Sequence, residues 1–249
     1  MSHDSPTPTR FWWITLAAIL AIALTASLGV WQLGRAAQKQ ALLDAVRAQA
    51  GRAPLEGRDI GREGDHAANR AGLIHRAVVL RGTWVADRTV FLENRQMDGK
   101  PGFVVVTPLL LEGARVAVAV QRGWAPRNFI DRTQLPPVET PAGPVSIEGR
   151  LVPPPSRLFE FEAASAGVIR HNLDLSAFAA ESGLPLLTDV SVQQTGAPSE
   201  GLTRRWPPPA AGVEKHHGYA FQWFGLSGLI AVLYVWFQVV RRFRRAPRS

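Results

Sequence analysis

Two long runs without a charged residue lie near opposite ends of this chain and restrict what it can fold into. Phe11 to Leu33 is 23 residues long, and as a helix it would span about 34 Å against a hydrocarbon core of about 30 Å. Tyr219 to Val240 is a second such run, of 22 residues. A cleaved signal peptide is the alternative for the first run, because Ala21-Ile22-Ala23 resembles a cleavage site, but the apolar residues continue to Leu33. We therefore expect two transmembrane helices, at residues 11–33 and 219–240.

The charges at the ends predict the orientation of these helices. Two spans place both termini on one side, and five arginines crowd the last nine residues, which the positive-inside rule assigns to the cytoplasm. Residues 1–10 and 241–249 are then cytoplasmic, and residues 34–218 form a domain on the other side. The head carries one acid, Asp4, and lacks the Arg-rich look of a mitochondrial transit peptide. The sequence thus predicts a bacterial inner-membrane protein, with the lipid bilayer around it and a periplasmic central domain.

Composition excludes several kinds of chemistry. Between the head and the tail, 22 Lys and Arg face 19 Asp and Glu, so the balance is too even for a nucleic-acid surface and we expect no nucleic-acid partner. The chain has no cysteine and only Met1 and Met97 as sulfur ligands, which argues against disulfides, thiol nucleophiles and copper transfer through thiolates.

The central segment contains short β-type runs separated by turn residues. Spacings of this kind suit antiparallel hairpins. One short helix is expected, capped by Asp174 or Ser176 and ended by Gly183-Leu184-Pro185. The fold class is therefore α+β, a mainly antiparallel β domain with one short helix, flanked by the two membrane helices. The predicted strands are Ala77 to Trp84, Thr89 to Glu93, Gly102 to Pro108, Arg115 to Arg122, Val145 to Leu151 and Thr188 to Gln193.

Between the first membrane helix and the strands, two further features are predicted. The helical pattern of the first span continues to Gly51, so that helix should extend beyond the membrane. Pro54 to Asn69 shows no period and is interpreted as a loop. Two triple-proline segments, Pro153-Pro154-Pro155 and Pro207-Pro208-Pro209, are predicted to be stiff extended spacers.

Enzyme signatures are missing from the sequence. It contains no Gly-x-Ser-x-Gly elbow, no His-Glu-x-x-His, no P-loop and no dinucleotide fingerprint. We expect a protein that is not an enzyme and has no catalytic residue.

Five motifs in order carry a resemblance to a known family. Together they resemble the Surfeit-one family, which includes the yeast Shy-one protein and consists of assembly factors for haem-copper cytochrome c oxidase. This chain departs from the family pattern at Gln121, at Glu214 and upstream of the short helix. The motifs are Leu28-Gly29-Val30-Trp31-Gln32 with Arg35 and Lys39, Asn94-Arg95, Gly102 to Leu109, Arg122-Gly123-Trp124-Ala125-Pro126, and His216 with Tyr219 to Phe224.

The resemblance implies a function and its partners. The protein would hold or position haem a for insertion into oxidase subunit I, with haem a synthase as a second candidate partner. A membrane scaffold for the nascent subunit that never touches haem is the first alternative. A polysaccharide chain-length regulator also has two anchors and a proline-rich segment, but it needs long helices in the middle domain.

The same resemblance singles out His216 as the metal ligand among six histidines. His216, Tyr219 and Trp223 share one helix face at the headgroup level, and Trp31 and Arg35 lie at the matching end of the first helix. These five are the predicted cofactor-binding residues, with the haem ring between the two helices. An aromatic belt with a snorkelling arginine is the simpler interpretation.

Two further sets of residues have predicted roles. Arg35, Arg204, Arg205 and Lys215 are candidates to neutralise the haem propionates. Arg122-Gly123-Trp124 is interpreted as structural, with Arg122 paired inside the domain and Gly123 permitting a tight turn.

Overall fold

Two long apolar helices lie at the ends of the described chain. The structure is a computed structural model and describes residues 8–61, 70–131, 134–158, 167–207 and 212–240. α1 (Pro8–Ala50) has 43 residues and α5 (Val213–Tyr234) has 22, followed by the π-helical turn η2 (Val235–Val240). Both are long and apolar enough to cross a membrane. The arginine tail and Pro208-Pro209 fall outside the described residues.

The helix surfaces support membrane association. Large apolar side chains point outward on both helices, among them Trp12, Trp13 and Phe221, which are 68%, 71% and 79% exposed. Such surfaces are stable only in contact with lipid or another apolar partner. α1 continues to Ala50 and stops before Gly51, so the predicted extension of the helix beyond its apolar run is confirmed.

The two helices contact each other through a regular row of small and polar residues. On α1 the half-buried or buried positions recur every three or four residues, and the same spacing repeats on α5. That spacing is the heptad pattern of packed helix pairs, and small residues on the row let the backbones approach closely. The row on α1 is Thr15, Ala18, Ile22, Thr25, Gly29, Gln32 and Ala36, and on α5 it is His216, Ala220, Trp223, Ser227, Ile230 and Tyr234.

Three contacts show that the pairing is antiparallel. The Thr15 and Tyr234 hydroxyls are 2.9 Å apart, and the Ser227 hydroxyl donates to the Ile22 carbonyl at 3.4 Å. Further along the pair, Gly29 faces Phe224, and a Cβ added to Gly29 would lie 2.8 Å from the Phe224 ring. Helix α1 and helix α5 therefore meet directly along this row.

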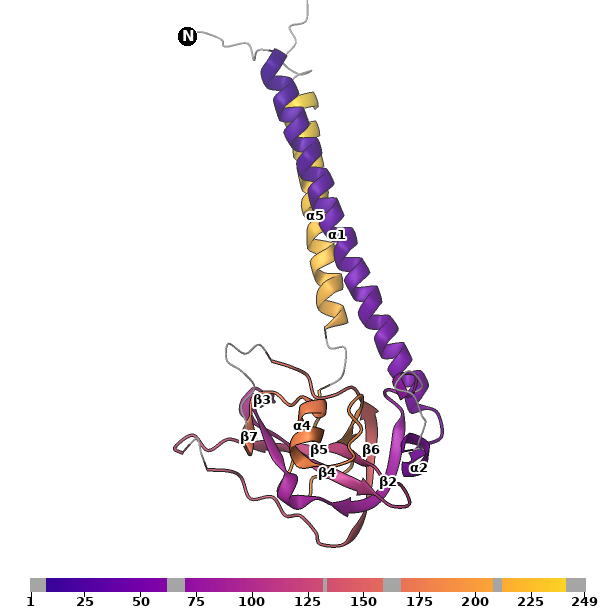
Figure 1. Cartoon of the computed structure of the whole chain (residues 1–249). Helices are drawn as coiled ribbons and strands as arrows, with labels where there is room; N and C mark the ends of the chain where they lie inside the picture. Colours follow the sequence, from indigo (N-terminus) through magenta and orange to yellow (C-terminus); the bar gives the residue numbers. More distant parts are fainter. Residues whose placement is uncertain (1–7, 62–69, 132–133, 159–166, 208–211, 241–249) are drawn as a thin grey trace, which may run out of the picture. The chain divides into compact units, whose positions relative to one another are not determined.

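The domain between the helices, Ala45–Pro207, is a β-rich unit. Its sheet has eight strands, and most of its pairings are antiparallel, as predicted. Figure 1 labels most of the domain's elements. They are β1 (Leu55–Glu56), α2 (Gly57–Ile60), β2 (Ala77–Trp84), η1 (Ala86–Arg88), β3 (Val90–Met97), β4 (Lys100–Leu111), β5 (Ala117–Pro126), β6 (Pro144–Val152), β7 (Ile169–Arg170), α4 (Leu175–Ser182) and β8 (Ser191–Gln194).

Five of these strands close into a ring. β2 pairs with β6, β6 with β8, β8 with β5, β5 with β4, and β4 returns to β2. The interior is filled by apolar residues that alternate along the strands, including Leu80, Leu109, Val120, Leu151 and Val192. A second apolar cluster lies under α4 around Phe178. The α+β class is confirmed, and the five strands form a small barrel of mainly antiparallel pairs.

The barrel differs from the sequence prediction in two places. The segment interpreted as a loop, Pro54 to Asn69, contains β1 and α2 in its described part, and β1 pairs in parallel with β2. β8 also pairs in parallel with β5, which the hairpin pattern did not predict. Both pairings join segments distant in sequence, so local patterns carry no signal for them.

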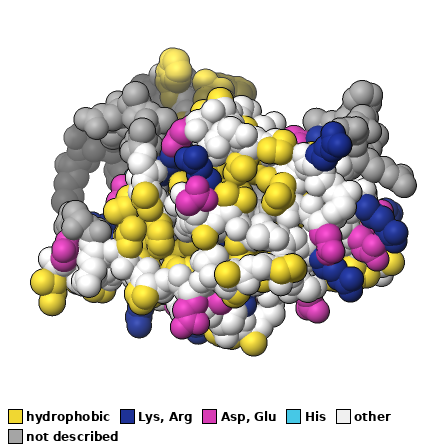
Figure 2. Space-filling model, turned by 60° about the horizontal axis from the view of Figure 1, so that its bottom comes forward, with side chains coloured by type: hydrophobic (Ala, Val, Ile, Leu, Met, Phe, Trp, Pro, Cys, Tyr) yellow, Lys and Arg dark blue, Asp and Glu magenta, His cyan; other side chains and the backbone are white. Residues whose placement is uncertain are grey.

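The domain surface has no single-signed field on the face that Figure 2 presents. Acidic and basic side chains are interspersed there, with hydrophobic ones between them. A mixed surface of this kind is typical of a folded domain in water.

Candidate functional site

The predicted ligand, His216, lies on the contact row of α5 and reaches across to α1. Its Nδ1 is 2.7 Å from Gln32 Oε1. Because an amide oxygen only accepts, the imidazole donates from Nδ1, and in the neutral ring the lone pair then lies on Nε2. His216 is half-buried, and its neighbour His217 is exposed. The structure thus orients His216 as a ring with one fixed donor and one nitrogen able to bind a metal.

Positive charge lies near this imidazole. Burial lowers the pKa of His216, and the charges of Lys39 and Arg35 lower it further. Arg35 also donates to Gln38 Oε1 on its own helix at 3.0 Å, and the Lys39 amine lies near the start of α5, 3.7 Å from where a Cβ of Gly212 would be. Positive charge next to a neutral imidazole suits an anionic group.

The structure places the predicted aromatic residues around His216 in different ways. Trp223 lies on the contact row, one turn beyond Ala220. Tyr219 is 50% exposed and Trp31 is 57% exposed, so both lie on the flanks of the helix pair and not on the row. The expected common face of His216, Tyr219 and Trp223 is therefore split, with Tyr219 at its edge.

The position predicted for the haem ring, between the helices, stays a prediction, although the two helices pack closely there. Gly29 lies against Phe224, and Gln32 lies against His216, so the helices already touch at the levels where the ring was placed. A Cβ added to Gly29 would lie 2.8 Å from a carbon of the Phe224 ring, so the two helices are closely packed at this level. Trp31 and Tyr219 expose their rings on the flanks of the pair.

Gln32 is the site residue that sequence reasoning missed. Gln32 belongs to the first of the five motifs, but no role was predicted for it. A signal was available, because Gly29, Gln32 and Ala36 follow heptad spacing, and an amide in an apolar helix requires a partner. The partner, His216, is identified only once the structure shows which face of α1 packs against α5.

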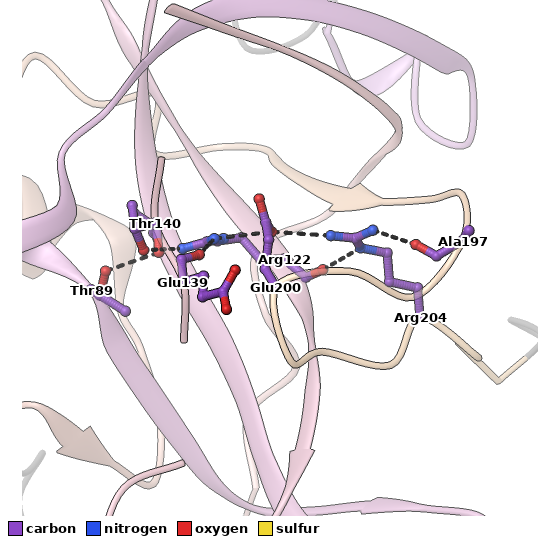
Figure 3. A network of polar contacts seen from close by, with 8 residues as sticks. Thr89, Arg122, Glu139, Thr140, Ala197, Glu200 and Arg204 are labelled. Carbon is purple, nitrogen blue, oxygen red and sulfur yellow. Dashed lines mark hydrogen bonds and ion pairs between the residues drawn. The ribbon is translucent and has the colours of Figure 1, made fainter. Parts of the chain in front are cut away.

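A second polar cluster lies inside the domain, around Arg122 (Figure 3). Arg122 has 0% exposure, and its guanidinium forms an ion pair with Glu200 at 3.0 Å. It also donates to the Thr140 hydroxyl at 2.7 Å and to the Glu139 carbonyl at 2.5 Å, and it stacks 4.8 Å from the Trp84 ring centroid. The prediction that Arg122 pairs within the domain is confirmed.

A β-bulge gives Arg122 this position. Val105 pairs with Gly123 and Val106 with Gln121, so Arg122 has no partner on β4. A bulge changes the direction of a side chain and bends the strand. Gly123 is not in a tight turn, which corrects the prediction. It lies within β5, and a Cβ there would be 2.7 Å from Leu202 Cβ.

Arg204 belongs to the same cluster. It donates to the Arg122 carbonyl at 2.8 Å and to Glu200 at 3.2 Å, as Figure 3 shows. Burial lowers the pKa of Arg204, and the Glu200 carboxylate opposes that shift. Arg205 pairs with Asp98 at 2.6 Å on the surface. Both guanidiniums are engaged within the domain, so the suggestion that they neutralise propionates loses its support.

Comparisons with known proteins agree with the motifs. The model of the SURF1 family matches residues 19–228. This chain belongs to the SURF1 family. Its relatives include a SURF1-like protein of Drosophila melanogaster, 28% identical over 90% of this chain and 77% of the relative, and a SURF1-like protein of Monosiga brevicollis, 24% identical over 88% and 85%. Surfeit locus protein 1 of Arabidopsis thaliana is 29% identical over 49% of this chain and 36% of its own length.

The family match covers most of the features described above. Residues 19–228 include most of α1, the whole barrel and the first part of α5 with His216. The SURF1 family is known for cytochrome oxidase assembly. The recognition made from the five motifs is therefore confirmed.

Proposed function

We propose that this protein is a membrane-anchored assembly factor for haem-copper cytochrome c oxidase, and that it acts without catalysing a reaction. The observation that carries this proposal is the SURF1 family match over residues 19–228. The absence of sequence signatures for catalysis is consistent with it. Subunit I of the oxidase is the proposed partner, with haem a synthase as a second one.

The helix pair is the proposed holding site for haem a. Haem, when bound, supplies an iron that takes a neutral imidazole nitrogen as its ligand. His216 fits this requirement, because its contact with Gln32 leaves Nε2 as the nitrogen with the lone pair. Trp31, Tyr219 and Trp223 would provide aromatic surface, and Arg35 with Lys39 would face the carboxylates. The ring would rest on the flank of the pair, since the row between the helices is closed.

The proposed location is a bacterial inner membrane, with residues 34–218 in the periplasm. It rests on the five tail arginines and on the composition of the head. The named relatives are eukaryotic, so the compartment stays a proposal. A reporter active only in the periplasm, inserted at the open turn of Gly113, should be active, and the same reporter after Ser249 should be silent. The reverse pattern would contradict this orientation.

A haem-independent scaffold for the nascent subunit is the second candidate. The closed row of small residues favours it, because a tightly packed helix pair could act as a rigid anchor alone. The polysaccharide regulator receives no support, because it needs long helices in the middle domain. In the described part of the domain, α2 has four residues and α4 has eight.

Deletion of the gene tests the assembly role. Loss of the protein should lower the amount of assembled oxidase and its haem a spectrum, while respiration through other terminal enzymes and growth by fermentation continue. A plasmid copy should restore both. Normal oxidase content in the deletion strain would contradict the proposal.

A further inference from the structure

A cavity of about 440 Å³ lies in the domain, beside the strands β3, β4, β5 and β8. Leu92, Val104 and Trp124 lie in register across three of these strands, and Gln121 and Gln193 lie in register across β5 and β8. These residues lie on the side of the strands opposite to the barrel interior, because side chains alternate along a strand. The volume falls within the range of small-molecule sites.

Two tryptophans give the cavity an apolar character. The Trp124 indole donates to the Arg95 carbonyl at 2.8 Å, and the Trp206 indole donates to the Gln194 carbonyl at 2.7 Å. Each indole has a single N–H donor, so both are already satisfied by the backbone. Their rings offer the cavity apolar and stacking surface, next to Leu92 and Val104.

Arg95 brings a positive charge to this apolar surface without a counter-ion. Its guanidinium donates to the Ser156 hydroxyl at 3.2 Å and to the His171 carbonyl at 3.0 Å. Its Nε is buried and has no hydrogen-bond partner, and its pKa is lowered by burial. Among the described residues, no carboxylate lies within ion-pair distance of it. The hydrogen bonds to Ser156 and His171 therefore offset only part of the cost of burying this charge.

A second arginine adds to this charge behind the cavity wall. Arg150 donates to Gln193 Oε1 at 2.8 Å, and its own Nε is buried without a partner. Because Arg150 uses the oxygen of Gln193, the side-chain NH2 group of Gln193 is left as a donor. In the described part of the chain, Arg150 has no carboxylate in ion-pair distance either. Arg95 and the NH2 group of Gln193 thus supply hydrogen-bond donors to the cavity wall.

From this arrangement we propose that the cavity beside Arg95 binds a small ligand with an apolar, flat body and a carboxylate. The carboxylate pairs with the guanidinium of Arg95, and the apolar body lies against Trp124 and Trp206, with the Gln193 amide as a further donor in the cavity wall. An arginine recognises a carboxylate through charge-assisted hydrogen bonds, and Arg95 is the arginine that lines this cavity. This site is distinct from His216, because all of its residues belong to the unit Ala45–Pro207.

Binding of 2-naphthoate to the purified full chain tests the proposal, with 2-naphthylmethanol as the neutral probe of the same shape. Calorimetric titration should show binding of the carboxylate and at least about 10-fold weaker binding of the alcohol, because a hydrogen bond to a charged group is lost. Arg95→Gln should weaken the binding of 2-naphthoate by a similar factor. Arg157→Gln is the matched control, since Arg157 lies on the same wall segment, is exposed and pairs with Asp174.

A second variant guards against misfolding of Arg95→Gln. Gln193→Glu keeps the shape of the side chain and places a carboxylate beside Arg150, so it should abolish naphthoate binding without lowering the melting temperature. Equal binding of the acid and the alcohol would overturn the proposal, and so would unchanged binding in both variants. Failure of the unmodified chain to bind naphthoate would also overturn it and would leave an acidic side chain of a partner protein as the alternative counter-ion.

Discussion

The Arg122 cluster predicts a large loss of stability when one charge is removed from it. Glu200→Gln keeps the size of the side chain but leaves the fully buried Arg122 without a counter-ion. Removing one partner of a buried ion pair typically lowers the free energy of unfolding by about 3–5 kcal/mol. Glu200 is 17% exposed, so we expect the lower end, about 3 kcal/mol. In a domain of this size that corresponds to a fall in melting temperature of roughly 6–12 °C.

Asp98→Asn is the matched control for this experiment. Asp98 also pairs with an arginine, Arg205, but the two side chains are 54% and 72% exposed. Surface pairs of this kind contribute less than about 1 kcal/mol. Both Glu200 and Asp98 have a positive φ, 58° and 50°, and each substitution keeps the shape of the side chain, so neither adds backbone strain. Unfolding of the full chain, followed by calorimetry at neutral pH, compares them directly.

A double variant separates the effect of charge from the effect of shape. If the loss comes from an unpaired buried guanidinium, Arg122→Met should recover part of the stability in the Glu200→Gln background, because no charge then remains buried at that position. Equal melting temperatures of Glu200→Gln and Asp98→Asn would refute the reasoning. Further destabilisation by Arg122→Met would show that packing around the side chain, and not its charge, holds the cluster together.

Two further predictions concern a helix cap and the helix contact. The Asp174 carboxylate caps α4, and hydrogen bonds from the backbone of Ala177 and then Ser176 hold its pKa below the usual 3.8. The contribution of the charged cap to stability is therefore complete above the unfolded-state pKa and is lost as the pH falls through the lower folded-state pKa. Asp174→Ala should lower stability by about 1 kcal/mol at neutral pH, and a melting series should show that Asp174→Asn keeps most of the cap without the acid dependence. Gly29→Leu should push α1 away from Phe224, so that a lower mole fraction of dodecyl sulfate suffices to separate the two helices. Gly34→Leu should leave that mole fraction unchanged, because a side chain at Gly34 meets open space. Equal behaviour of the two leucine variants would contradict the helix contact.

Much of the fold could be predicted because it depends on local patterns. The alternation from Ala77 to Trp84 matches β2 at both ends. Asp174 caps α4, and Gly183 ends it in the left-handed conformation with φ 68°. Ring closure could not be predicted, since it depends on the pairing of β4 with β2 and of β5 with β8 across long stretches of chain.

The site was predictable only in part, for the same physical reason. The sequence indicated His216 and the ends of both helices, but a single helix does not reveal which face its partner will cover. Ala220 turned out to lie on the contact row beside His216, and Tyr219 at its edge. The role of Gly123 was missed because the close neighbour, Leu202, lies far along the chain.

The most direct test of the central claim is the visible spectrum of the purified full chain, produced in cells that make haem a. We expect the unmodified protein to carry haem a, and His216→Ala to lose it while the amount of membrane-inserted protein stays the same. His217→Ala should keep the pigment. Gln32→Ala should retain a reduced amount of haem a, and its Soret band should be shifted. The reason is that loss of a partner that orients a metal ligand lowers metal affinity about 10–100-fold. A His216→Ala protein that keeps its pigment and supports oxidase assembly would contradict the account.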